Sequence, residues 1–91
     1  MNEEALRLIK YLGFKMYKDL RYENGKLFWP NGKRAGYLRK DGYRRIKHKG
    51  KNLMEHRVIW EKHKGKIPKG MQIDHINGCR SDNRLENLRL C

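Results

Sequence analysis

The chain has 91 residues, the length of one small domain, and its 23 Lys and Arg against 10 Asp and Glu give a net charge of +13. A charge of this size is tolerated most easily beside a polyanion, and no apolar run approaches the roughly 20 residues that span a bilayer, so we expect a nucleic-acid partner and no membrane. The acidic start argues against a secretion signal, and Cys79 and Cys91 form no CxxC pair for zinc, which favours a reduced, cytoplasmic protein.

The first 20 residues are predicted to form a helix. Asn2 can cap it, and apolar side chains recur at helical spacing from Ala5 to Leu12. We therefore expect a helical lead-in over residues 1–20 and the main domain over residues 21–91.

Short strands and tight turns are predicted to follow. Asn24–Gly25 and Pro30–Asn31–Gly32 are turn signals. Two short strands are expected at Gly36–Leu38 and Gly42–Lys47, and Lys49–Gly50 marks the next turn. This spacing is typical of small antiparallel sheets.

The second half of the chain adds one helix and two more strands. The apolar pattern predicts a short helix over His56–His63. Strands are expected at Met71–His75 and Leu85–Leu90, with a turn at Asn77–Gly78 between them. The predicted fold is therefore a small α+β domain with short antiparallel strands.

An acid next to a histidine is the most informative pair in the sequence. The carboxylate of Asp74 is a hard oxygen ligand for a divalent ion, and the imidazole of His75 accepts protons near neutral pH. A regular strand would point these side chains to opposite faces, so one site needs the strand to break at His75. The Asn77–Gly78 turn supplies that break, and Asn87 is placed to hydrogen-bond the loop backbone.

Five segments in a fixed order carry a family resemblance. They are Gly42–Ile46, His56–Trp60, Gly65–Gly70, Ile73–Gly78 and Asp82–Arg89. With these gaps, the chain from about Gly42 to Leu90 resembles the HNH (His-Asn-His, ββα-metal) nucleases of phages and mobile introns.

The resemblance implies a metal-dependent DNA endonuclease or nickase that is phage-encoded and acts in a bacterial host. It makes His75 the general base, Asp74 a ligand of Mg²⁺ or Mn²⁺, and Asn87 the residue that braces the catalytic loop. The third family residue, a His or Asn in a following helix, would lie beyond Cys91, so only the ββ part of the ββα site is expected here. The resemblance thus leaves open a second chain or partner that completes the metal site. The alternative is a non-catalytic DNA-binding relic or truncated fragment.

The middle of the chain is strongly basic. Nine Lys and Arg fall within residues 33–51, where Asp41 is the only acid, and this predicts contact with the DNA backbone. The predicted DNA contacts are Arg39, Lys40, Arg44, Arg45, Lys47, Lys49, Lys51 and Arg84. Charge alone would also suit an RNA- or ribosome-associated protein, but the Asp74, His75 and Asn87 series argues against it.

Other polar residues near the motif are expected to be structural. His56 is predicted to pack at a helix start, with a role as second metal ligand as the alternative. Asp82 and Asn83 are predicted to set the loop turn through side-chain-to-backbone bonds, the alternative being an extra metal ligand. His48 and His63 are expected to be solvated among lysines.

Overall fold

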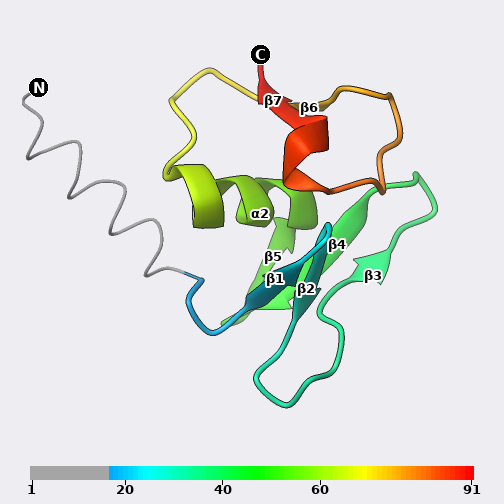
Figure 1. Ribbon diagram of the computed structural model, residues 1–91, viewed down its shortest axis with the longest axis vertical. Coiled ribbons are helices and arrows are strands. Elements are labelled where there is room, and N and C mark those ends of the chain that lie inside the picture. Colours follow the sequence, from blue (N-terminus) through cyan, green and yellow to red (C-terminus); the bar gives the residue numbers. More distant parts are fainter. Residues whose placement is uncertain (1–16) are drawn as a thin grey trace, which may run out of the picture.

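The computed structural model describes residues 17–91, so most of the helix expected over residues 1–20 lies outside the described residues. The described part is a small α+β domain with three antiparallel sheets and one α-helix (Figure 1). Its elements are β1 (Arg21–Glu23), β2 (Lys26–Phe28), β3 (Tyr37–Leu38), β4 (Arg44–His48), β5 (Lys51–Met54), α2 (Glu55–Lys64), β6 (Ile73–His75), a 3₁₀ turn (Leu85–Asn87) and β7 (Leu88–Leu90).

The β1–β2 hairpin is closed by Asn24 and Gly25, as the sequence predicts. Both residues have positive φ, 46° and 84°, which is the conformation of the two-residue turns that fit twisted hairpins. A side chain at Gly25 would come within 2.8 Å of the backbone nitrogen of Arg84. The backbone N–H of Leu85 also donates to the hydroxyl of Tyr22 at 2.9 Å. The hairpin is therefore fixed against the segment that precedes β7.

The central sheet has the order β3–β4–β5 and confirms the predicted strands and the turns between them. Tyr37 pairs with Arg45, and Ile46 pairs with Leu53. Because side chains alternate along a strand, Ile46 faces the core while Arg45 and Lys47 lie on the opposite face. The sheet thus has one face toward the core and one basic face.

Helix α2 connects the sheets. It contacts β4, β5 and β6, and Figure 1 shows it between the β6–β7 hairpin and the other two sheets. Its buried residues Val58 and Ile59 join one core cluster. The other buried apolar members are Tyr17, Leu20, Leu27, Ala35, Ile46, Ile67, Ile73 and Leu88. Within residues 17–91, no helix has the length and apolar character needed to cross a membrane.

Two predictions on local structure are wrong. Residues 85–87 form a 3₁₀ turn rather than the start of a strand, because the N–H of Asn87 bonds back to the carbonyl of Arg84 at 2.8 Å. His48 is buried rather than solvated, since β4 turns it toward the core and Asp19 binds its Nε2 at 3.0 Å.

Candidate active site

His75 lies at the end of β6 with its side chain on the buried face. Its Nε2 is 2.8 Å from Oδ1 of Asn83. The ring centroid of His56 is 4.8 Å away, in an edge-on arrangement, and that of Tyr43 is 6.1 Å away. A ring enclosed in this way has a fixed orientation, which is the geometry that a general base requires.

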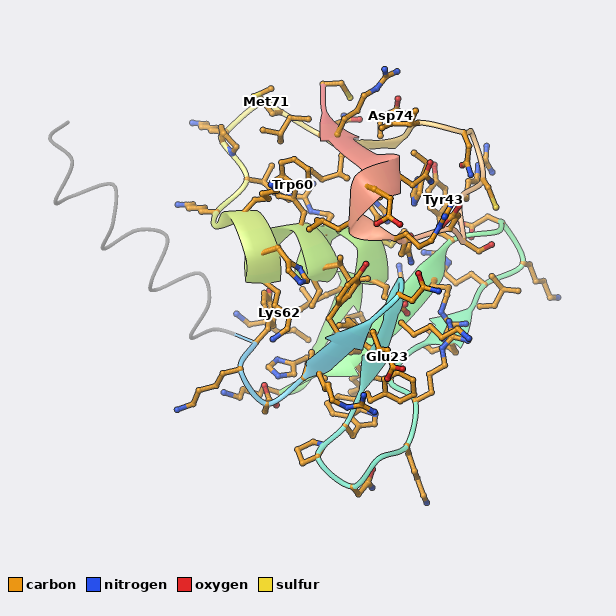
Figure 2. All side chains as sticks on the ribbon, in the orientation of Figure 1. Glu23, Tyr43, Trp60, Lys62, Met71 and Asp74 are labelled. Atoms are coloured by element: carbon orange, nitrogen blue, oxygen red, sulfur yellow. The ribbon has the colours of Figure 1, made fainter. Side chains whose placement is uncertain are left out.

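The strand ends at His75, as expected, but Asp74 and His75 point away from each other. Asp74 lies opposite Arg89, which donates from Nε and Nη2 to Oδ2 of Asp74 at 3.1 and 2.9 Å. The Asp74 side chain is 44% exposed, at the outer edge of the hairpin (Figure 2). The structure therefore does not bring these two residues together around one point.

Asp74 is the predicted metal ligand, and its carboxylate suits a metal. A carboxylate oxygen is a hard ligand that fits Mg²⁺ or Mn²⁺, and Mg²⁺ keeps several of its waters in protein sites. Both hydrogen bonds from Arg89 go to the same oxygen of Asp74. Among residues 17–91, no three His, Cys, Asp or Glu side chains are grouped so that they could hold a metal.

Asn87 holds the loop that follows His75. Its Oδ1 accepts from the backbone N–H of Asn77 at 3.1 Å, so the expected hydrogen bond to the loop backbone is present. Its Nδ2 donates to Oδ1 of Asn77 at 3.0 Å and to the carbonyl of Asp82 at 2.9 Å. Asn87 is buried, and the 3₁₀ turn rather than a strand directs its side chain into the loop. One side chain thus ties the two ends of the loop together.

The loop is also fixed by charged residues. The Arg84 guanidinium donates to both oxygens of Asp82 at 2.8 Å, and it holds the pKa of Asp82 well below its usual range despite some desolvation. Arg80 donates to the carbonyl of Asp41 at 2.9 Å and lies over the ring of Tyr43. Arg84, a predicted DNA contact, is therefore exposed but paired with Asp82.

The first turn of α2 carries two buried ionisable side chains, and one of them, His56, packs against His75. His56 is buried at the helix start, as predicted, and burial together with the neighbouring His75 lowers the pKa of His56 to about 4. Glu55 is completely buried and accepts from Nε of Arg44 at 2.9 Å. Glu55 was not predicted as a site residue, because an acid in the first turn of a helix normally interacts with the helix dipole at the surface.

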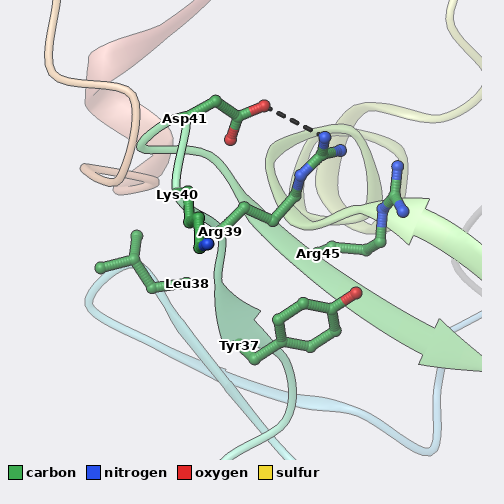
Figure 3. Close-up of a pocket in the computed structure, with 6 residues that line it drawn as sticks. All are labelled: Tyr37, Leu38, Arg39, Lys40, Asp41 and Arg45. Carbon is green, nitrogen blue, oxygen red and sulfur yellow. Dashed lines mark ion pairs between the residues drawn. The ribbon is translucent and has the colours of Figure 1, made fainter.

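The predicted DNA contacts fall into two groups. Two arginines form ion pairs within the protein: Arg39 pairs with Asp41 at 3.2 Å, and Arg44 pairs with Glu55 at 2.9 Å. Four lysines are exposed and form no ion pair with any residue that the structure describes: Lys40, Lys47, Lys49 and Lys51. Arg45 lines an open pocket beside Tyr37 and Leu38, which are 51% and 59% exposed (Figure 3).

Comparison with known proteins gives matches of two kinds. Residues 54–91 match the sequence profile of a family described as HNH endonuclease. The chain is 44% identical over 55 residues to "Uncharacterized gene 5.3 protein" of Enterobacteria phage T3, covering 54% of each chain. It is 51% identical over 35 residues to "Protein 3.8" of Escherichia phage T7, covering 38% of this chain and 29% of the relative.

The fold is also similar to that in a solved structure entitled "DNA binding and cleavage by the HNH homing endonuclease I-HmuI", with a TM-score of 0.67 and 28% sequence identity. The match covers 86% of this chain and 49% of the other. The chain thus spans about half the length, or less, of each of these proteins. Residues 54–91 are thus similar to the HNH endonuclease family, and the fold is similar to that of an HNH homing endonuclease.

Proposed function

We propose that the chain is a metal-dependent DNA endonuclease or nickase of HNH type, with residues 21–91 as its nuclease domain. The observation that carries the proposal is the environment of His75, a buried imidazole whose ring is held by Asn83 and whose loop is held by Asn87. Both curated relatives are phage proteins, so we place the activity in bacterial cells that carry the phage.

In this proposal His75 takes a proton from the water that attacks the phosphorus of a phosphodiester. A positioned general base is worth on the order of 10²–10⁴ in rate. A divalent ion held by Asp74 would supply charge neutralisation of the phosphate. The low pKa of His56 keeps that neighbouring ring uncharged at neutral pH, so it does not repel a cation at the site.

Metal binding competes with the ion pair between Asp74 and Arg89. The Arg89 side chain is 60% exposed, and exposed ion pairs contribute only about 0–1 kcal/mol. The pair is therefore weak enough for a divalent ion to displace it or to share the carboxylate. The remaining protein ligands would come from outside residues 17–91.

The proposed DNA-binding surface is the basic face of the β3–β4–β5 sheet. It combines the exposed Lys40 and Lys47 with Tyr37, Leu38 and Arg45 in the pocket of Figure 3. Lys49 and Lys51 lie at the β4–β5 turn, where they border a second pocket beside His48. Lysines neutralise phosphates, and an exposed aromatic ring can stack on a base. The similarity to a protein whose title names DNA binding and cleavage supports this assignment.

Incubation of supercoiled plasmid with the chain and Mg²⁺ or Mn²⁺ tests the proposal. We expect nicked circles, and we expect a chelator and Asp74→Ala each to abolish them. The second candidate is a non-catalytic DNA-binding relic, which is favoured by the lack of a complete metal-ligand group within residues 17–91. Tight plasmid binding without nicking in either metal would support the relic and contradict the enzyme.

A further inference from the structure

Glu55 is an acid at a position where acids are costly. Its side chain is 0% exposed, and only Oε2 has a partner, the Nε of Arg44. The second oxygen, Oε1, is buried without a hydrogen bond to any described residue. A buried charge destabilises a protein unless it is paired and its hydrogen-bonding capacity is satisfied. Oε1 of Glu55 therefore needs a hydrogen-bond donor.

Asn83 has a buried hydrogen-bond donor that lacks an acceptor. It is 1% exposed, its Oδ1 contacts Nε2 of His75 at 2.8 Å, and its Nδ2 is buried without a partner in the described chain. Asn83 contacts His75, the ring of His75 packs against His56, and His56 follows Glu55 in α2. Burial raises the pKa of Glu55, whereas Arg44 and the Asn83 amide lower it. One unsatisfied donor and one unsatisfied acceptor thus belong to adjacent side chains, and buried polar groups are almost always paired.

We propose that Glu55 and Asn83 are positioning residues that fix the tautomer of His75. Oε1 of Glu55 accepts from Nδ2 of Asn83, and this holds Oδ1 of Asn83 toward Nε2 of His75. Because an amide oxygen only accepts, Nε2 of His75 carries the hydrogen and Nδ1 keeps the lone pair. The consequence for catalysis, that Nδ1 is the basic nitrogen, rests on the proposed function of His75.

The ion pair with Arg44 favours an ionised Glu55 carboxylate that accepts a hydrogen bond from Asn83. An ionised carboxylate accepts hydrogen bonds only, so it cannot present a donor to Asn83 and allow the amide to turn over. Arg44 from β4 compensates its charge. At Gly36, which has a φ of +84°, an added Cβ would lie 2.5 Å from Oε2 of Glu55, so the backbone closes directly over the carboxylate. The series from Arg44 through Glu55 and Asn83 connects the basic sheet to His75.

The test is the ring tautomer of His75, read from ¹⁵N shifts by NMR on the full chain at a pH where the ring is neutral. Wild type should show hydrogen on Nε2. Glu55→Gln is nearly isosteric, but the new amide can donate a hydrogen bond. The Asn83 amide can then rotate by about 180° and present its Nδ2 to His75, so the hydrogen of the His75 ring should appear on Nδ1. Asn83→Ala removes the acceptor and leaves the Arg44 pair intact, and it should give a mixture of tautomers. In both variants we expect nicking to fall roughly 10- to 100-fold, the usual loss for an outer partner of an active-site group.

Glu61→Gln is the matched control, since Glu61 is a half-buried acid on the same helix that faces Tyr17 rather than His75. It should leave the His75 tautomer unchanged. Hydrogen on Nδ1 in wild type, or unchanged tautomers in folded Glu55→Gln and Asn83→Ala, would overturn the positioning roles. A wild type that never nicks but shows the expected tautomer changes would overturn the proposed function and leave the positioning roles standing.

Discussion

The β6–β7 hairpin with its loop and the β3–β4–β5 sheet are both rich in polar residues, but they use them differently. In the hairpin region, His75, Asn83 and Asn87 are buried and bonded within the protein. On the sheet, Lys47 and Lys49 are exposed and form no ion pair with the described residues. One region is therefore preorganised by internal bonds, while the other leaves its charge exposed.

The largest expected effect concerns the sheet and its salt dependence. If six to ten phosphates are neutralised, DNA affinity should fall by about 10³–10⁵ between roughly 50 and 200 mM salt. Fluorescence anisotropy with a labelled duplex measures this. Lys47→Ala should lower the slope of log affinity against log salt by about one, whereas Lys66→Ala, an exposed lysine outside the sheet, should not. A flat salt dependence would contradict the role of the basic face.

The contact between α2 and the hairpin should instead respond to acid, because His56 of α2 packs against His75. Burial lowers the pKa of His56 from 6.5 to about 4, so between these values the unfolded chain binds more protons than the folded one. The contribution of neutral His56 is complete above pH 6.5 and is lost as the pH falls toward 4. We expect the free energy of unfolding to decrease by up to about 3 kcal/mol over this range. Urea titrations at several pH values should show this decrease in wild type and a smaller one in His56→Phe; equal slopes would contradict the assignment.

Asn87 tests how far the loop depends on one side chain. Asn87→Ala removes three hydrogen bonds and leaves buried polar groups unpaired, so the free energy of unfolding should fall by about 1–3 kcal/mol. Asn31→Ala is the control, because Asn31 makes a single exposed bond in a surface turn. Chemical denaturation measures the free energy of unfolding of both variants. An equal decrease in Asn87→Ala and Asn31→Ala would contradict the prediction that the buried loop bonds stabilise the protein more than an exposed one.

The smallest effect is expected at Arg89. Arg89→Ala frees the Asp74 carboxylate from an exposed ion pair of about 0–1 kcal/mol, so Mn²⁺ affinity should rise by at most about fivefold. Calorimetric titration with Mn²⁺ measures this. Arg21→Ala breaks a similarly exposed pair with Glu23, far from Asp74 in the sequence, and should leave the affinity unchanged. Weaker Mn²⁺ binding in Arg89→Ala would mean that Arg89 supports the metal ligand rather than competing with it.

Features set by neighbouring residues were predictable from the sequence. The Asn24–Gly25 turn and the helix at residues 55–64 depend on local conformational preference and apolar spacing. The 3₁₀ turn at Leu85–Asn87 was not predictable, because a short apolar pattern with leucines at 85, 88 and 90 fits a strand or a helical turn.

The site was predictable only in part. The bond from Asn87 to the loop backbone followed from its position after the turn. The pairs of Glu55 with Arg44 and of Asn83 with His75 depend on how sheet, helix and loop pack, and their residue types give no local signal. The opposite directions of Asp74 and His75 follow from strand alternation, which the break at His75 does not remove.

His75→Ala in the plasmid-nicking assay tests the central claim most directly. We expect the nicking rate to fall by about 10²–10⁴, with DNA affinity and melting temperature close to those of wild type. His63→Ala, a half-buried histidine that bonds the Ile59 carbonyl on α2, should nick at the wild-type rate. Nicking by folded His75→Ala at the wild-type rate would contradict the account.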